Sequence, residues 1–191
     1  PFAISNSEMN EYLSLTNSNK VNFIISTQRR FNEMFTKMHS LLPKLGRVFS
    51  FDAKYCLSVK KLDEGWRAKQ ELSGGGALID MGYHYIDLLL WFFGIPQKIN
   101  YLATEQNRIG QFYDVEDTLV LSFLYQKEQT KCIGNLYLTR IYPIKTEILS
   151  ISCQFKLLKT RNHYRFKIQL YCVIKFEKCG KKIPLPQTSH P

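Results

Sequence analysis

The spacing of apolar residues predicts two helices and two strands in the first third of the chain. Residues 6–18 carry apolar side chains at helical intervals behind a Ser-Asn pair suited to an N-cap, which predicts a short helix. Residues 21–26 are nearly continuously apolar, as a strand of a parallel sheet would be. Residues 30–43 predict a second helix, and residues 47–57 alternate like a half-buried strand. This alternation of helices and strands is typical of α/β proteins.

The stretch of residues 73–94 combines three consecutive glycines with a strongly apolar helix. Within it Asp80, His84 and Asp87 lie four and then three residues apart, which places them on one helical stripe. The remainder of the helix is apolar nearly all round, and this predicts that the helix is buried. A Gly-Ile-Pro sequence then ends it.

Two interpretations of the stripe are open from its spacing. A buried Asp–His pair can simply satisfy its hydrogen bonds and hold the helix in place. Alternatively, a carboxylate one turn from a histidine can orient the ring and keep it basic, which suits an acid/base dyad. The glycines before the helix would let the backbone approach a ligand closely.

Three further strands are predicted after this helix, over residues 98–103, 117–125 and 130–138. The link between the last two has the length of a hairpin loop. Runs of strands after a buried helix favour an α+β fold with a mixed, largely antiparallel sheet packed against helices. An α/β remnant would then stand at the N-terminus.

The glycine-helix stretch resembles the signature of the Gfo/Idh/MocA family, the group of glucose–fructose oxidoreductase and inositol dehydrogenase. Seven positions follow the family pattern in order: Gly74, Gly75, Leu78, Asp80, Gly82, His84 and Asp87. The resemblance implies that His84 is the catalytic base on the substrate hydroxyl and that Asp80 is its hydrogen-bonding partner. It also implies that Asp87 and Gly75 lie against the substrate.

Trp66-Arg67, in the polar loop over residues 58–72, resembles a pair that some family members carry before the glycines. Arg67 is either a substrate contact or simply stacked on a tryptophan that anchors the loop.

The resemblance extends to the start of the chain, where Pro1 and the segment Gln28-Arg29-Arg30-Phe31 match the family order. It implies NAD or NADP as the cofactor, with Arg29 and Arg30 on the cofactor side. If Pro1 belongs to the family's Glu-Lys-Pro motif, the catalytic lysine falls one residue before this sequence. No G-x-G-x-x-G phosphate loop occurs either. We therefore expect a fragment that is inactive alone.

Charge separates the end of the chain from its body. Residues 155–191 hold nine Lys or Arg against one acid, which is +8 of the chain's formal +10. A basic segment without an interleaved motif is usually solvated, so nucleic acid is not an expected partner. The expected organisation is a nucleotide-binding remnant over residues 1–29, a substrate and oligomerisation domain over residues 30–154, and a basic tail over residues 155–191. Within that tail, residues 166–176 alternate like a strand.

The remaining composition narrows the class of protein. A hydrophobic content of 45% indicates a globular chain, and no apolar run reaches the roughly 18 residues of a membrane span. We expect a cytoplasmic protein with no membrane partner. The five cysteines show no C-x-x-C pair, so neither a zinc site nor a disulfide framework is expected.

Together these observations predict part of an NAD(P)-dependent oxidoreductase acting on a sugar, polyol or diol hydroxyl and assembling as a homo-oligomer through its sheet. The alternative is a non-catalytic oligomerisation or binding remnant of the same family.

Overall fold

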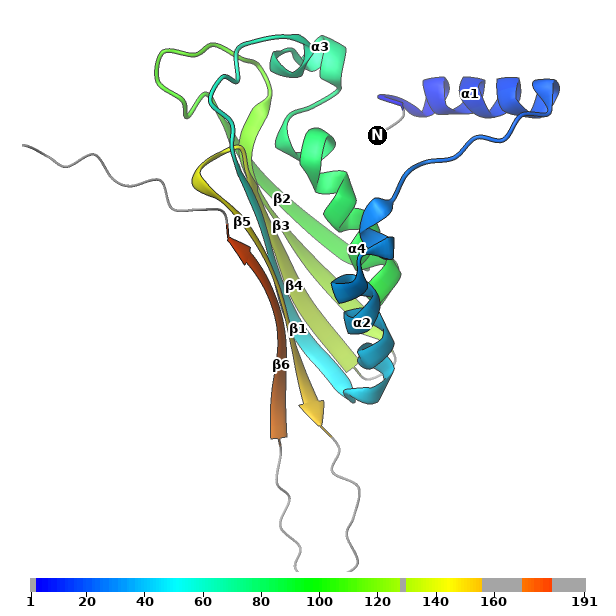
Figure 1. The fold of residues 1–191 in the computed structure, drawn as a ribbon, viewed down its shortest axis with the longest axis vertical. Helices are drawn as coiled ribbons and strands as arrows, with labels where there is room; N and C mark the ends of the chain where they lie inside the picture. Colours follow the sequence, from blue (N-terminus) through cyan, green and yellow to red (C-terminus); the bar gives the residue numbers. More distant parts are fainter. Residues whose placement is uncertain (1–2, 128–129, 156–169, 180–191) are drawn as a thin grey trace, which may run out of the picture.

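A single six-stranded sheet organises the structure, a computed structural model that describes residues 3–127, 130–155 and 170–179. The strand order is β2-β3-β4-β1-β5-β6 (Figure 1). The strands are β1 (Arg47–Ser58), β2 (Lys98–Glu105), β3 (Glu116–Lys127), β4 (Thr130–Thr139), β5 (Ile141–Phe155) and β6 (Leu170–Cys179). Only β1 and β4 pair in parallel among these strands, and the other neighbours are antiparallel. The predicted α+β class, with a mixed and largely antiparallel sheet, is confirmed.

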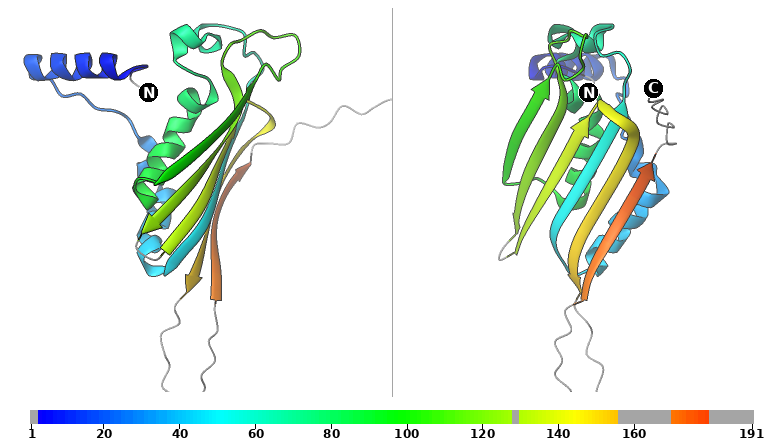
Figure 2. Two further views of the ribbon diagram at one scale, coloured as in Figure 1. Left: turned by 180° about the vertical axis from the view of Figure 1, so that it is seen from behind. Right: turned by 90° about the vertical axis from the view of Figure 1, so that its left-hand side faces the viewer.

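Helices cover one face of the sheet. The helices α2 (Glu33–Leu41) and α4 (Tyr83–Phe93) lie along this face, as the two views of Figure 2 show. On the opposite face no helix from the described part of the chain lies against the strands (Figure 2). The sheet is therefore half-covered, as antiparallel sheets commonly are.

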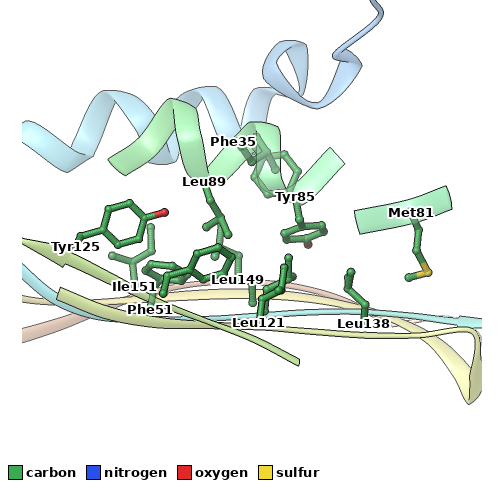
Figure 3. Packing of buried hydrophobic residues seen from close by; sticks show 14 of the residues in the cluster. Phe35, Phe51, Met81, Tyr85, Leu89, Leu121, Tyr125, Leu138, Leu149 and Ile151 are labelled. Atoms are coloured by element: carbon green, nitrogen blue, oxygen red, sulfur yellow. The ribbon is translucent and has the colours of Figure 1, made fainter. Parts of the chain in front are cut away.

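The core fills the space between α4, α2 and the covered face (Figure 3). Tyr85 and Leu89 point from α4 toward the sheet, where Phe51 and Ile151 meet them (Figure 3). Phe51 lies opposite Gly134 of β4, and its ring occupies the place where a Cβ of residue 134 would be. The α4 helix is thus buried on one side, whereas the sequence predicted burial nearly all round. Its outer side carries Leu90, which is 40% exposed.

The first predicted helix is confirmed as α1 (Asn6–Asn19). Ser5 caps it, because its Oγ accepts a hydrogen bond from the Glu8 N–H at 3.1 Å. The helix has no buried residue and projects away from the sheet (Figure 1).

The strand predicted over residues 21–26 is wrong, because this segment has no regular secondary structure. Ile24 is 85% exposed, and no strand from the described ranges pairs with the segment. A strand's backbone N–H and C=O groups need a neighbouring strand, which apolar composition alone does not supply.

The helix predicted over residues 30–43 is divided. A 3₁₀ turn, η1 (Gln28–Phe31), precedes α2, and a second one, η2 (Leu42–Lys44), follows it. Asn32 begins α2 because its Oδ1 accepts a hydrogen bond from the Met34 N–H at 3.0 Å, as an N-cap does.

The strands predicted over residues 47–57, 98–103, 117–125 and 130–138 are confirmed as β1 to β4. No strand was predicted from the sequence over the residues of β5. Its buried Leu149, Ile151 and Cys153 alternate with Ser150 and Ser152, a period-two pattern that favours a strand.

The strand β6 overlaps the predicted alternation over residues 166–176, extends three residues beyond it and pairs with β5; residues 166–169 lie outside the described ranges. Of the rest of the predicted basic tail, Phe155 ends β5, and residues 156–169 and 180–191 lie outside the described ranges.

Cysteine and metal chemistry contribute little to the described structure. Cys56 and Cys132 are buried thiols, and burial raises the pKa of each to about 11. Within residues 3–127, 130–155 and 170–179, no group of three or more His, Cys, Asp or Glu side chains could hold a metal ion. None of the helices described is both long enough and apolar enough to cross a membrane.

Candidate active site

The glycine run turns the chain between α3 (Gln70–Ser73) and the helix that carries the motif. Glu116, the first residue of β3, holds this turn with both carboxylate oxygens. They accept hydrogen bonds from the N–H groups of Gly76, at 2.8 Å, and Leu78, at 2.9 Å. A carboxylate at this position satisfies N–H groups that otherwise lack partners at a helix start, and it interacts favourably with the helix dipole.

Close backbone packing explains the third glycine. A Cβ on Gly76 would lie 1.9 Å from the backbone oxygen of Glu116, and neither of these two backbone segments could shift easily. Gly75 has φ +156°, and a Cβ there would meet Ile79 at 2.6 Å. The described contacts of these glycines are with β3 and the helix, and substrate binding at Gly75 stays a prediction.

Replacing Gly76 by Ala is expected to lower the free energy of unfolding by about 1–3 kcal/mol or more, the usual range for overpacking. Urea denaturation followed by circular dichroism measures this change. Gly110→Ala is the control, because a Cβ there meets nothing within 4 Å and only its positive φ of 78° is strained. We expect a loss of about 1 kcal/mol for the control. Equal losses for the two variants would contradict the backbone clash.

The motif helix begins with a π-helical turn, η4 (Leu78–Gly82), and continues as α4. The 3.6-residue spacing assumed for the predicted stripe therefore applies only from Tyr83 onward. Asp80 lies in the π turn and accepts a hydrogen bond from the Nε of Arg67 at 3.0 Å. Among the described residues, no hydrogen bond joins Asp80 to His84.

His84 lies between Asp80 and Asp87 along the helix and is partly exposed. Its ring packs against that of Tyr83, with centroids 3.8 Å apart. Burial lowers the pKa of His84 below its ordinary value, and the positive charge of Arg29 acts in the same direction. Asp87 and Asp80 oppose this shift. A neutral imidazole at neutral pH results, and a neutral imidazole can accept a proton.

Arg30 binds Asp87 through two hydrogen bonds. Its Nε donates to Oδ2 at 2.8 Å and its Nη2 donates to Oδ1 at 2.5 Å. Both carboxylate oxygens of Asp87 are engaged by this fork, a strong and directional arrangement. The structure thus pairs two predicted site residues with each other, and it adds no support to Asp87 as a substrate contact or Arg30 as a cofactor contact.

Arg29 is ion-paired with Glu147 of β5 and is only 14% exposed. Its guanidinium also lies over the rings of Tyr55, at 4.6 Å, and Tyr85, at 4.9 Å. The hydroxyl of Tyr85 donates to the same Glu147 at 3.0 Å. These contacts fix η1 to the sheet and to α4. The cofactor contact of Arg29 stays a prediction.

A pocket of ≈ 430 Å³ opens beside Asp80. It is lined by Val59, Lys61, Leu62, Glu64, Gly65, Trp66, Arg67, Asp80 and Arg140. Arg67 lies over the ring of Trp66 at 4.4 Å and also pairs with Asp80. The stacked arrangement that the sequence left open is therefore present, and the same guanidinium lines a pocket. His84 is not among the lining residues.

Neither Arg140 nor Glu147 was predicted from the sequence to lie in this region. Arg140 stands between β4 and β5 and is only 2% exposed. Burial lowers the pKa of Arg140, and the negative charges of Asp80, Glu116 and Asp117 oppose that effect. The sequence did carry a signal for Arg140, because this charged residue follows directly after the apolar alternation of β4. Buried charges are rare, so a charge at such a position is worth noting as a candidate site residue.

Comparison with known proteins gives the family. The model of the GFO/IDH/MocA C-terminal domain matches residues 41–156. Oxidoreductase P35 of Formosa agariphila is 26% identical over 117 residues, which cover 58% of this chain and 36% of that protein. The scyllo-inositol 2-dehydrogenase (NADP(+)) IolU of Bacillus subtilis is 28% identical over 130 residues, covering 64% of this chain and 38% of that protein.

A solved structure shows the same fold. Levoglucosan dehydrogenase in complex with NADH and levoglucosan superposes with a TM-score of 0.67 at 14% identity, covering 92% of this chain and 53% of that chain. The chain thus matches about half or less of the length of these relatives. The family match spans more than half of the 191 residues, so the chain belongs to the Gfo/Idh/MocA family and carries its C-terminal domain.

Proposed function

We propose that this chain is the substrate-domain part of an NAD(P)-dependent oxidoreductase that acts on the hydroxyl of a sugar, polyol or diol. The observation that carries the proposal is His84, whose imidazole is kept neutral on the family's motif helix beside two carboxylates. Related proteins favour the same chemistry, since one is named an NADP-dependent inositol dehydrogenase and another was solved with NADH and levoglucosan.

In such a reaction the described residues supply the group that accepts the proton and the charge that stabilises its protonated form. A ring nitrogen of His84 accepts the hydroxyl proton, and the neutral state favoured by burial makes it available for this. Asp80 acts as a neighbouring negative charge that stabilises the imidazolium once it forms. A bound nicotinamide supplies the hydride acceptor. Residues 1–191 contain no glycine-rich phosphate loop to hold it, and Arg29 and Arg30 are already paired with carboxylates.

The alternative function is a non-catalytic module that associates through the open face of the sheet. That face and its β2 edge expose apolar side chains, including Leu102 at 75% and Ile133 at 58%. Exposed apolar area of this kind is typical of an interaction surface. Self-association is compatible with both functions, so it does not decide between them.

The test combines the mass of the native protein from its source with an activity assay. Light scattering and intact mass give the size of the chain and of its assembly. The same sample is then incubated with inositols, aldoses and levoglucosan, with NAD⁺ or NADP⁺, and absorbance is followed at the nicotinamide band. Reduction with at least one polyol or sugar is expected. An assembled protein that reduces neither cofactor with any of them would instead support the non-catalytic module.

A further inference from the structure

Each carboxylate beside His84 on the motif helix is bound by an arginine from another part of the chain. Asp87 lies three residues after His84 in α4, and Arg30 of η1 binds both of its oxygens, at 2.8 Å and 2.5 Å. Asp80 lies in the π turn before α4 and accepts a hydrogen bond from Arg67 at 3.0 Å. The ring of His84 makes no hydrogen bond among the described residues. Both neighbouring carboxylates therefore have partners other than the histidine.

The spacing of His84 and Asp87 would ordinarily favour a direct pair between them. Both lie in the α-helical part of the motif helix, where side chains three residues apart are neighbours, with about 5–6 Å between their Cβ atoms. A carboxylate at that distance stabilises a protonated imidazole and raises the pKa of the histidine. Arg30 therefore binds the group that is well placed to keep His84 protonated.

Arg30 is held in place at both of its ends. Its carbonyl oxygen accepts a hydrogen bond from the Oγ1 of Thr36, on α2, at 3.0 Å. Its guanidinium binds Asp87 and also lies over the ring of Trp91, 5.9 Å from the centroid. Trp91 follows Asp87 by four residues in α4, so the two contacts lie on one side of the helix. Because a bidentate bond fixes direction as well as distance, the carboxylate of Asp87 is held on η1.

Among the described residues, one arginine and two carboxylates set the charge around His84. Burial lowers the pKa of His84 and Arg29 adds to this effect, whereas Asp87 and Asp80 oppose it. The ring of Tyr83 packs against the imidazole, and burial raises the pKa of its hydroxyl, which therefore carries no charge near neutral pH. The protonation of the imidazole thus depends on how fully the two carboxylates are compensated.

We propose that Arg30 is a positioning residue for His84: it holds the carboxylate of Asp87 away from the ring and compensates its charge, so that the imidazole stays neutral and free to accept a proton. The role of His84 as a base rests on the proposed function, whereas the effect of the pair on the ring does not. Arg30 acts through Asp87 and touches no reacting atom. A pair that only held η1 against α4 would leave the titration of His84 unchanged, so the two roles give different measurable results.

The experiment is an NMR titration of the native protein. The ring C–H signals of His84, identified by their loss in His84→Asn, are followed through the acid and neutral range. Arg30→Gln leaves Asp87 uncompensated, so the midpoint should rise by at least about 0.3 pH, which is about twofold in the protonation equilibrium. The double variant Arg30→Gln/Asp87→Asn retains neither charge, and its midpoint should return to within about 0.2 pH of the unaltered protein. An unmoved midpoint in Arg30→Gln, or the same rise in the double variant, would overturn the proposal.

Lys37→Gln is the matched control for the loss of one positive charge. Lys37 lies on α2 with an exposed side chain, and it forms no ion pair among the described residues. Solvent and salt screen such a charge, so the midpoint should stay within about 0.1 pH. A rise equal to that of Arg30→Gln would indicate a general effect of net charge and contradict the proposal.

If Arg30→Gln does not fold, Asp87→Asn gives the answer with the opposite sign. It leaves the guanidinium of Arg30 uncompensated near His84, and the midpoint should fall by at least about 0.3 pH. A midpoint that stays in place or rises would overturn the proposal.

Activity measurements separate this inference from the proposed function. In a dehydrogenase that uses His84 as its base, the acid limb of kcat/KM should rise in Arg30→Gln by the same amount as the NMR midpoint. Dehydrogenase activity together with an unmoved midpoint would overturn this inference alone. A raised midpoint in a protein without dehydrogenase activity would support the role of Arg30 and contradict the proposed function.

Discussion

If the proposed oxidoreductase function holds, replacing His84 by Asn is expected to lower kcat of the native protein by about 10²–10⁴-fold, the range for loss of a positioned general base. Asn keeps a polar side chain of similar reach but cannot accept the hydroxyl proton at neutral pH. His84 lies on the motif helix between two carboxylates and makes no hydrogen bond with Asp80 or Asp87 among the described residues. The substitution therefore breaks no hydrogen bond with either carboxylate. Steady-state kinetics with the preferred polyol measure the change.

His39 provides the matched control. It lies on α2, and its ring stacks on Trp91 with centroids 4.1 Å apart. His39→Asn removes a histidine from the same domain without touching the motif helix's polar stripe, so kcat should stay within about threefold of the unaltered protein, a loss too small for a catalytic base. If His84→Asn retained its turnover, or if both variants lost it equally, His84 would not be the base.

The pH profile gives a second test of the same assignment. A base works in its neutral form, so activity falls as pH drops through its pKa. Burial and Arg29 lower the pKa of His84, and the acid limb of kcat/KM should therefore lie below the ordinary histidine value of about 6.5. An acid limb above that value would contradict the lowered pKa.

Most of the sheet could be predicted because its strands carry their own local signal. In β1, the side chains of Phe51 and Ala53 are buried while those of Asp52 and Lys54 are more exposed, and this alternation is visible in the sequence. The order of the strands was not predictable in this way. The parallel pairing of β1 with β4 joins Phe51 to Gly134, and no short-range pattern connects residues so far apart. The failed strand over residues 21–26 shows the converse, since apolar composition without a partner does not make a strand.

The candidate site, like the sheet, could be predicted only where the signal is local in the sequence. The spacing of Asp80, His84 and Asp87 correctly indicated a helix with polar groups among apolar ones. The spacing could not indicate which side chains would pair with the carboxylates. Arg67 reaches Asp80 from 13 residues away, and Arg30 reaches Asp87 from 57 residues away. Local periodicity therefore gives the location of the candidate dyad, whereas its hydrogen bonds depend on tertiary contacts.

Glu147, on β5, holds two separate segments to the sheet, although it takes no part in the proposed chemistry. It accepts a hydrogen bond from the Tyr85 hydroxyl at 3.0 Å and pairs with Arg29, whose guanidinium lies over two tyrosine rings. Both members of the ion pair are mostly buried, at 8% exposure for Glu147 and 14% for Arg29. Removing one partner of such a pair leaves a buried charge without compensation.

Glu147→Ala is therefore expected to lower the free energy of unfolding by about 3–5 kcal/mol, measured by urea denaturation. Glu64→Ala serves as the matched control. It breaks an ion pair with Lys61 in which both side chains are more than half exposed, so its loss should stay below about 1 kcal/mol. In the double variant Arg29→Met/Glu147→Leu, apolar groups replace both charges, and much of the stability should return. A loss below about 1 kcal/mol for Glu147→Ala, or no recovery in the double variant, would mean that packing around the aromatic rings, and not the ion pair, holds η1 against α4.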